Sequence, residues 1–178
     1  EIKIKTPWPG IMKNVINGKK YWEKYWDKDN NFRMFDLATE KNNSIYIHGR
    51  LDDVINIRGH RIGSEEVESV ILENKNIVEC CAISSTDYYE GNVLYVFYVS
   101  KKVIDKDKII KKIKNNFGTY AIPKHIIRLN ELPKTKSGKI LRRLLRDLTN
   151  GDNIRKKDIS TINNINIIKE IKLKVKKI

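Results

Sequence analysis

Cysteine is scarce in this chain of 178 residues: it has two, Cys80 and Cys81, and they are adjacent. Neighbours on a strand point to opposite faces, so this pair is unsuited to a disulfide, and no C-x-x-C metal spacing occurs. No apolar run approaches the ~18–20 residues of a membrane span, and the segment Glu1–Lys5 lacks the apolar core of a signal peptide. These absences predict a reducing compartment and no membrane span. We expect a cytoplasmic protein and leave a nuclear location open.

Acidic residues are few in the second half of the chain. Residues 1–100 contain 13 basic and 15 acidic groups, whereas residues 101–178 contain 23 basic and only 7 acidic ones. This imbalance predicts an anionic partner for the second half, or else a lysine-rich composition without a partner. A basic nucleic-acid-binding module is therefore one alternative function. The sequence shows no aromatic platform or recognition helix, so we expect no specific nucleic acid partner.

Local patterns predict a mixed α+β architecture. Alternating or β-branched runs predict strands over 32–38, 44–48, 54–57, 60–62, 77–84 and 93–99, with a further short strand within 121–129. Helical spacing predicts helices from Ser64, over 105–116 and over 140–148. Gly59 is a candidate hairpin turn between two of the strands. Beyond Asn150 the sequence is rich in Asn, Ile and Lys, and we expect weak order there.

Two short segments concentrate residues suited to binding anions. The first, Gly49–Arg61, combines glycines, aspartates and arginines whose planar forks suit phosphate or carboxylate. The second, Pro133–Lys139, is a loop of small residues with three lysines that opens the helix predicted from Ile140. It is not a Walker loop, because Pro133 stands where that pattern needs Gly and Ile140 where it needs Ser or Thr. Taken singly, each also fits an ordinary turn with surface ion pairs or a solvated basic loop.

Taken together, the two segments resemble the adenylate-forming ligase superfamily, in particular the short-chain AMP-forming acyl-CoA synthetases and, most closely, acetyl-CoA synthetases. The resemblance covers Pro7 to about Asp152. The motifs that carry it are Pro7-Trp8-Pro9-Gly10, Phe35-Asp36, Gly49–Arg61, Leu132–Arg143 and Gly151-Asp152 with Asp158-Ile159-Ser160-Thr161. Because the sequence begins without Met, we expect it to be the tail of a longer chain.

The resemblance implies a domain organisation. Residues 1–51 would be a β-rich remnant of a large adenylation domain, and residues 53–150 a small, mobile C-terminal lid. The lid would contain a short hairpin and a three-stranded sheet with helices. A hinge would lie at residue 52, and residues 151–178 would form a low-complexity basic tail.

The resemblance also implies a reaction. Such a ligase makes acetyl-CoA from acetate, ATP and CoA through acetyl-AMP, releasing AMP and pyrophosphate, with Mg²⁺ accompanying the ATP. The segment alone would be inactive. Its acyl pocket would lie upstream, so propionate or a similar acid remains an alternative substrate.

Site residues follow from the same resemblance, position by position. Lys139 matches the catalytic lysine, which would bridge the carboxylate and the α-phosphate, and the resemblance implies that it would also be a target for an acetyltransferase and a deacetylase. The other matches are Asp36, Arg50 and Arg61 for the nucleotide, Asp52 for the hinge, and Arg58, Gly59 and Lys114 for CoA. Two of these depart from the pattern: Arg58 replaces a small residue, and Lys114 replaces an arginine. No metal-ligating residue is assigned.

Overall fold

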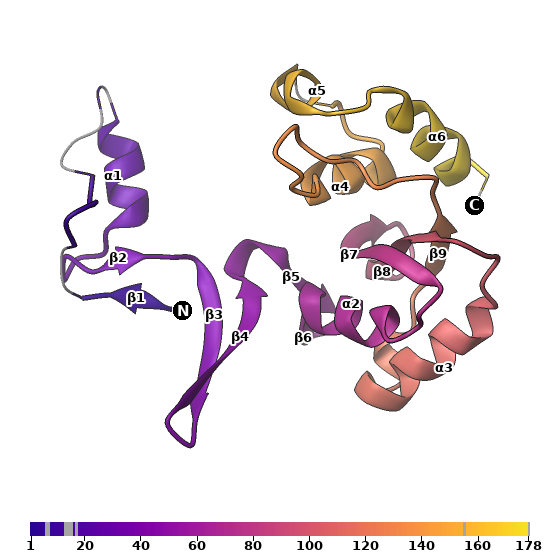
Figure 1. The fold of residues 1–178 in the computed structure, drawn as a ribbon, viewed down its shortest axis with the longest axis horizontal. Coiled ribbons are helices and arrows are strands. Elements are labelled where there is room, and N and C mark those ends of the chain that lie inside the picture. The colour runs from indigo at the N-terminus through magenta and orange to yellow at the C-terminus, as the bar shows by residue number, and fades with distance from the viewer. Residues whose placement is uncertain (6–7, 13–15, 17, 155, 178) are drawn as a thin grey trace. The chain divides into compact units, whose positions relative to one another are not determined.

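The computed structural model describes residues 1–5, 8–12, 16, 18–154 and 156–177. Pro7, one of the motif residues, therefore lies outside the described residues. The chain divides into two compact units, residues 1–54 and residues 55–178, and each is described here by itself (Figure 1). The hinge at residue 52 remains a prediction.

The first unit consists of two small antiparallel sheets and one short helix. Its elements are β1 (Lys3–Ile4), α1 (Lys19–Tyr25), β2 (Phe32–Arg33), β3 (Asp36–Lys41), β4 (Ser44–Arg50) and the 3₁₀ turn η1 (Leu51–Asp53). β1 pairs with β2, and β3 pairs with β4. The prediction of a single strand over 32–38 is wrong, since the strand is interrupted between β2 and β3. Phe35 has φ of +61°, a left-handed conformation that no continuous strand can contain.

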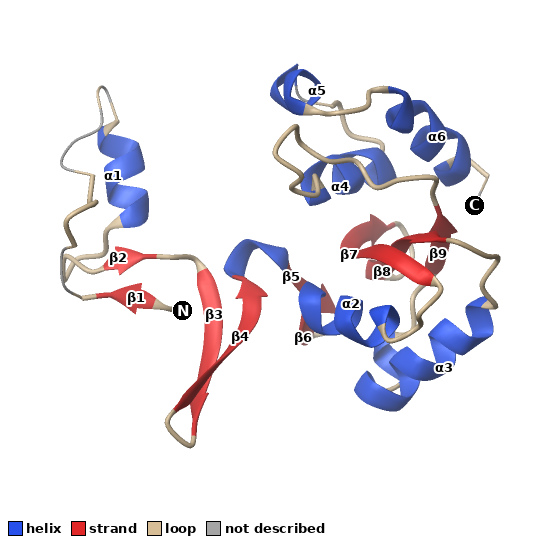
Figure 2. Cartoon of the chain, viewed as in Figure 1, coloured by secondary structure: helices blue, strands red, loops and turns tan. Residues whose placement is uncertain are grey.

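The second unit is an α+β domain built on a mixed three-stranded sheet (Figure 2). β7 and β8 are antiparallel, and β9 runs parallel to β8. A separate two-stranded sheet joins β5 to β6, so the predicted hairpin and three-stranded sheet are confirmed. The elements are β5 (Val54–Ile57), β6 (His60–Gly63), α2 (Ser64–Leu72), β7 (Ile77–Asp87), β8 (Gly91–Ser100), α3 (Lys106–Phe117), η2 (Thr119–Ala121), β9 (His125–Arg128), α4 (Arg142–Asn150), α5 (Lys156–Thr161) and α6 (Asn166–Val175).

The three-stranded sheet is buried on both faces because its strands are apolar on both sides. Cys80 and Ala82 of β7 belong to one core cluster, with residues of α2 and α3. Cys81 and Ile83 belong to the opposite cluster, with residues of α4 and α6. Both cysteines are buried, and neither forms a disulfide, in line with their adjacency. Burial also raises the pKa of the Cys80 thiol to about 12, which keeps it protonated and unreactive at neutral pH.

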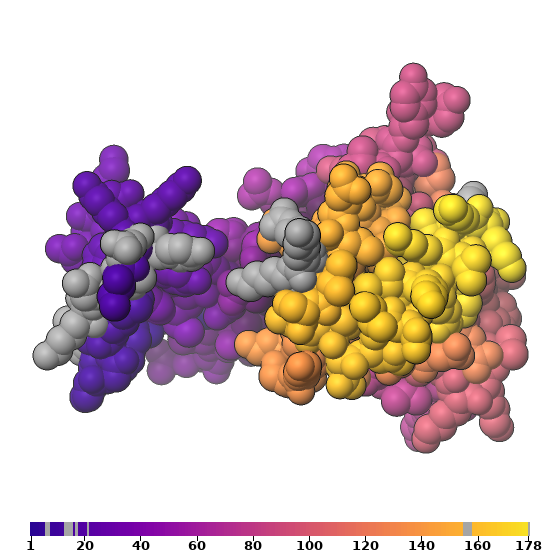
Figure 3. All heavy atoms as spheres, turned by 90° about the horizontal axis from the view of Figure 1, so that it is seen from above, coloured from indigo at the N-terminus to yellow at the C-terminus, as the bar shows by residue number. Residues whose placement is uncertain are grey.

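The C-terminal segment is part of the second core. The expectation of weak order after Asn150 is wrong for the described residues, because α5 and α6 form and the segment is anchored by isoleucines. The buried ones are Ile162, Ile167, Ile168 and Ile171. In Figure 3 the orange and yellow C-terminal residues cover one side of the second unit. The isoleucines at these positions form a continuous buried stripe, which the composition of the segment alone does not reveal.

Candidate functional site

Lys139 closes a tight turn between β9 and α4. The Thr135 N–H donates to the Lys139 carbonyl (2.8 Å), and the Gly138 N–H donates to the Thr135 carbonyl (2.9 Å). The Lys139 N–H in turn donates to the Thr135 hydroxyl oxygen (3.1 Å). Gly138 has φ of +84°, which favours glycine at this point of the turn. Thr135 therefore hydrogen-bonds to both the N–H and the carbonyl of Lys139.

The Lys139 loop does not open directly into a helix. α4 begins at Arg142, and Ile140 instead forms a β-bridge with Lys134. The predicted start of the helix at Ile140 is therefore wrong, because bridge pairing and the hydrogen bond from the Leu141 N–H to the Pro133 carbonyl (2.8 Å) keep these residues out of the helix. Lys139 is exposed, and the described part of the chain provides no ion pair to its ammonium group. Its charge is thus available to an anionic ligand.

In the first unit, Asp36, Arg50 and Asp52 are brought together. Asp36 and Arg50 are register partners at the open end of the β3–β4 hairpin. The Arg50 guanidinium lies 3.5 Å from the Asp36 carboxylate and 3.0 Å from that of Asp52. Partial burial lowers the pKa of Arg50, but the hydrogen bond and charge of Asp52, with the charge of Asp36, raise it overall. Arg50 thus links the two predicted carboxylates.

Arg58 and Gly59 form the two-residue turn of the β5–β6 hairpin. Their φ angles are +48° and +82°, the pair of positive values typical of a type I′ turn. The Arg58 guanidinium donates to Glu90 (3.0 Å), and the Lys124 ammonium lies 2.8 Å from Glu90 and 2.7 Å from Asp87. The predicted hairpin turn at Gly59 is therefore confirmed, and Arg58 is part of a charged cluster on the surface.

A hollow of about 180 Å³ adjoins this cluster. Arg58, Glu90 and Lys124 contribute its charged lining, and Tyr120, whose ring stacks on His60 at 3.9 Å, contributes an aromatic wall. Sequence reasoning did not single out Glu90, Lys124 or Tyr120. Their proximity to Arg58 depends on tertiary folding across 32 or more positions, and no local pattern signals it.

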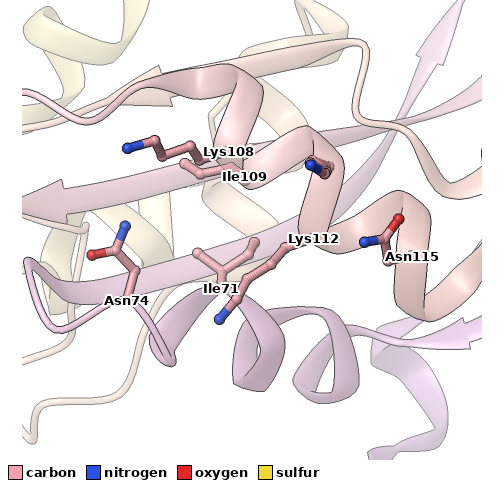
Figure 4. Close-up of a pocket in the computed structure, with 7 residues that line it drawn as sticks. Ile71, Asn74, Lys108, Ile109, Lys112 and Asn115 are labelled. Atoms are coloured by element: carbon pink, nitrogen blue, oxygen red, sulfur yellow. The ribbon is translucent and has the colours of Figure 1, made fainter.

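The remaining two predicted residues lie on separate elements of the second unit. Arg61 is exposed on β6, and Lys114 is exposed in the last turn of α3. A larger groove of about 340 Å³ lies between α2 and α3, and Figure 4 shows Ile71 and Ile109 facing each other within it. The residues lining it include none of the predicted site residues. They are Ile71, Asn74, Lys108, Ile109, Lys111, Lys112 and Asn115.

Across the described residues, no group of three or more His, Cys, Asp and Glu side chains gathers closely enough to hold a metal ion. No helix in the described part of the chain is both long and apolar enough to span a membrane.

Comparison with known proteins identifies relatives along almost the whole chain. Residues 66–139 match the model of the AMP-binding enzyme C-terminal domain. The chain is 32% identical to acetyl-coenzyme A synthetase 1 of Candida glabrata, a match covering 96% of this chain and 26% of that protein. It is 33% identical to acetyl-coenzyme A synthetase of Chlorobaculum tepidum, covering 95% of this chain and 27% of that protein. The chain therefore spans about a quarter of the length of the curated relatives it matches.

Solved structures share the fold. The o-succinylbenzoate CoA synthetase of Bacillus subtilis, in complex with an acyl-adenylate intermediate, matches with a TM-score of 0.64 and 28% identity, over 70% of this chain and 26% of that one. The amide bond synthetase of Marinactinospora thermotolerans matches with a TM-score of 0.65 and 18% identity, over 71% of this chain and 26% of that one. Residues 66–139 thus match the AMP-binding enzyme C-terminal domain, and almost the whole chain is similar to part of acetyl-CoA synthetases.

Proposed function

We propose that this chain is the C-terminal part of an acetate–CoA ligase, which makes acetyl-CoA from acetate, ATP and CoA through acetyl-AMP and releases AMP and pyrophosphate. The observation that carries the proposal is the match to acetyl-CoA synthetases, which extends over 95–96% of the chain. Lys139 is the last residue matched by the AMP-binding C-terminal domain model. The division of labour between the two units is part of the proposal. Residues 1–51 would belong to the large adenylation domain and residues 53–150 would form the lid, with residues 151–178 as a C-terminal extension.

The exposure of apolar side chains supports this division. Ile45, Tyr46 and Ile47 of β4 are 54–69% exposed, whereas the second unit has apolar clusters on both faces of its sheet. An exposed apolar strand is typical of a surface that packs against more protein. Residues 1–51 fit a piece of a larger domain better than a domain of their own.

Lys139 is the proposed catalytic residue of the first half-reaction. Attack of the carboxylate on the α-phosphate brings two anions together, and a fixed ammonium group between them stabilises the transition state. Two observations support this role: the Lys139 side chain is exposed, and its backbone is fixed by hydrogen bonds, so the charge extends from a fixed backbone position. Arg61, Asp36 and Arg50 would contact the nucleotide, and Arg58, Gly59 and Lys114 would contact CoA.

Asp52 is the proposed hinge residue. It lies in η1, two residues before the boundary between the compact units. A junction residue that absorbs a change in φ and ψ lets a rigid domain rotate between two half-reactions. Mg²⁺ would accompany ATP, and we assign it to no residue of this chain, since the described residues offer no cluster to hold it.

The exposed Lys139 side chain is also accessible to a modifying enzyme. Acetylation removes the charge of a lysine, so an acetyltransferase and a deacetylase acting at Lys139 would switch the first half-reaction off and on.

The test is acetate-dependent release of AMP from ATP by the full-length protein that carries this chain. We expect Lys139→Ala to lower the rate by about 10²–10³, because an electrostatic contact to the transition state is lost. The matched control is Lys136→Ala, which removes an exposed lysine of the same loop and should leave the rate nearly unchanged. The 178-residue chain alone should release no AMP.

Other outcomes would redirect or overturn the proposal. Activity with propionate or a longer acid but not with acetate would keep the chemistry and change the substrate. Absence of AMP release with any small acid would refute the ligase proposal. Nucleic acid binding that falls steeply with salt and is indifferent to Lys139 would favour the basic-module alternative.

A further inference from the structure

The C-terminal segment runs alongside the Lys139 loop. The Lys136 N–H donates to the Thr161 carbonyl (3.1 Å), and the Asn163 N–H donates to the Lys134 carbonyl (2.8 Å). Between these two hydrogen bonds, Thr135 and Ile162 form an antiparallel β-bridge. Residues 161–163, here called the C-terminal brace, therefore pair with residues 134–136 as a short strand.

Thr135 connects the C-terminal brace to Lys139. On one side it is the bridge partner of Ile162. On the other it donates its N–H to the Lys139 carbonyl (2.8 Å) and accepts the Lys139 N–H at its hydroxyl oxygen (3.1 Å). Displacement of Thr135 would therefore displace the Lys139 backbone with it.

The brace is itself firmly anchored. Ile162 is only 6% exposed and belongs to the same core cluster as Leu144 of α4 and Ile171 of α6. Beyond it, the Glu170 carboxylate of α6 accepts hydrogen bonds from the Asn130 N–H and side-chain amide, both at 3.1 Å. The Lys174 ammonium donates to the Arg128 carbonyl (2.6 Å) at the end of β9. The segment is thus fixed to the sheet from which the Lys139 loop departs.

A lysine needs such support to act on a reacting centre. Its side chain has four rotatable carbons and about 2 kcal/mol of rotamer entropy, so it delivers charge accurately only if its base is fixed. Catalytic groups must be held to within ~0.5 Å by the surrounding structure. The turn 135–139 supplies two hydrogen bonds to Lys139, and in the described structure its outer side is paired with the brace.

We propose that the C-terminal brace is a positioning element for Lys139. The C-terminal segment, predicted from the sequence to be a basic tail, would then be part of the adenylation machinery. This inference rests on the proposed function for its catalytic consequence. Its structural half, that residues 161–163 hold the 134–139 loop, stands independently of any activity.

The test compares Asn163→Pro with Asn163→Ala in the full-length protein. Proline has no N–H, so it deletes the hydrogen bond to the Lys134 carbonyl, whereas alanine keeps that N–H and removes only an exposed side chain. We expect hydrogen exchange at the Lys136 and Lys139 amides to quicken on the order of 5-fold in Asn163→Pro, as for loss of one net hydrogen bond, and to stay unchanged in Asn163→Ala.

The catalytic readout is acetate-dependent exchange of pyrophosphate into ATP. We expect Asn163→Pro to lower its kcat roughly 10-fold with little change in the KM for ATP, because charge placement rather than binding is impaired. In a Lys139→Ala background the same change should cause no further loss, since a residue acting through Lys139 has nothing left to position. Additive losses would indicate a merely structural role and overturn the proposal.

A second pair of variants covers the case in which Asn163→Pro fails to fold. Ile162→Ala and Ile171→Ala delete the same atoms from the same core cluster, but only Ile162 is in the brace. We expect faster exchange at Lys136 and Lys139 in Ile162→Ala than in Ile171→Ala at equal loss of global stability. Equal exchange in both would overturn the brace. If the wild type shows no pyrophosphate exchange but the amides respond as expected, the proposed function fails while the brace stands.

Discussion

At the scale of single residues, the β5–β6 turn shows whether backbone conformation or side-chain packing requires glycine at position 59. Gly59 has φ of +82°, and a Cβ added there would meet nothing within 4 Å. Glycine is therefore required by the backbone of the turn and not by crowding within this chain. A side chain at this position would instead project into open space, where the proposed function places CoA.

Gly59→Ala should thus destabilise the second unit by about 1 kcal/mol, the cost of a left-handed conformation for an L-residue. Urea unfolding of wild type and variant measures this loss. Arg58→Asn is the control, because asparagine tolerates φ of +48° better than arginine and only an exposed ion pair to Glu90 is given up. A loss well above 2 kcal/mol in Gly59→Ala would show that an unseen steric contact, not backbone strain, decides the residue.

Asp87 makes the free energy of unfolding depend on pH in the acid range. Its carboxylate accepts the Lys124 ammonium and the N–H groups of Glu90 and Tyr89, and these contacts lower its pKa to about 2 from a usual 3.8. The ionised form is favoured in the folded state, so the stabilisation is present above about pH 4 and is lost as the pH falls toward 2. Unfolding free energies measured from pH 5 to 2 should fall less steeply for Asp87→Asn than for wild type; parallel curves would contradict the assignment.

At the scale of elements, an ion pair links α2 to α4 at the β7 edge of the sheet. Glu68 of α2 is 8% exposed and accepts the Ala82 N–H of β7 (2.8 Å) and the Arg142 guanidinium of α4 (2.7 Å). Burial raises the pKa of Glu68, and the charge of Arg142 partly offsets that rise. Arg142 begins the helix that follows the Lys139 loop, so the pair helps to fix where that loop ends.

Glu68→Ala should lower the free energy of unfolding by about 3 kcal/mol, because both donors lose a buried acceptor. Glu68→Gln should cost less, since its side-chain carbonyl still accepts the Ala82 N–H. Thermal or urea unfolding of both variants decides the matter. Equal, small losses in the two variants would mean that water replaces the carboxylate and that the pair contributes little.

Elements with strong local patterns were predictable from the sequence, and those defined by distant partners were not. β7 and β8 follow from runs of β-branched and aromatic residues, α3 follows from helical spacing, and the Gly59 hairpin follows from one glycine between two short strands. α6 was missed because its isoleucines are interspersed with Asn and Lys, and the core that buries them is built from other elements, α4 and the three-stranded sheet. Likewise, Lys139 was found by motif, whereas the pairing of residues 134–136 with residues 161–163 was not.

At the scale of the whole molecule, the two units differ in how completely they bury their apolar residues. The second unit contains both core clusters. In the first unit, the described apolar residues of β4 stay largely exposed, and its aromatic contacts, such as that of Trp22 with Trp26 (ring centroids 5.2 Å apart), lie outside both clusters. Stability of the described chain therefore resides mainly in residues 55–178, and α6 closes one face of that unit.

Removal of α6 tests this view. A chain ending after Asn163 loses Ile167, Ile168 and Ile171, each nearly fully buried. At about 2 kcal/mol for each buried side chain, the loss is roughly 6 kcal/mol, which is comparable with the whole stability of a typical domain. We expect this truncation to abolish cooperative unfolding, as followed by circular dichroism. A chain ending after Val175 keeps all three isoleucines and the whole of α6, so it should remain folded. If the shorter chain unfolds as cooperatively as the longer one, α6 is an appendage and the C-terminal brace must be held by Ile162 alone.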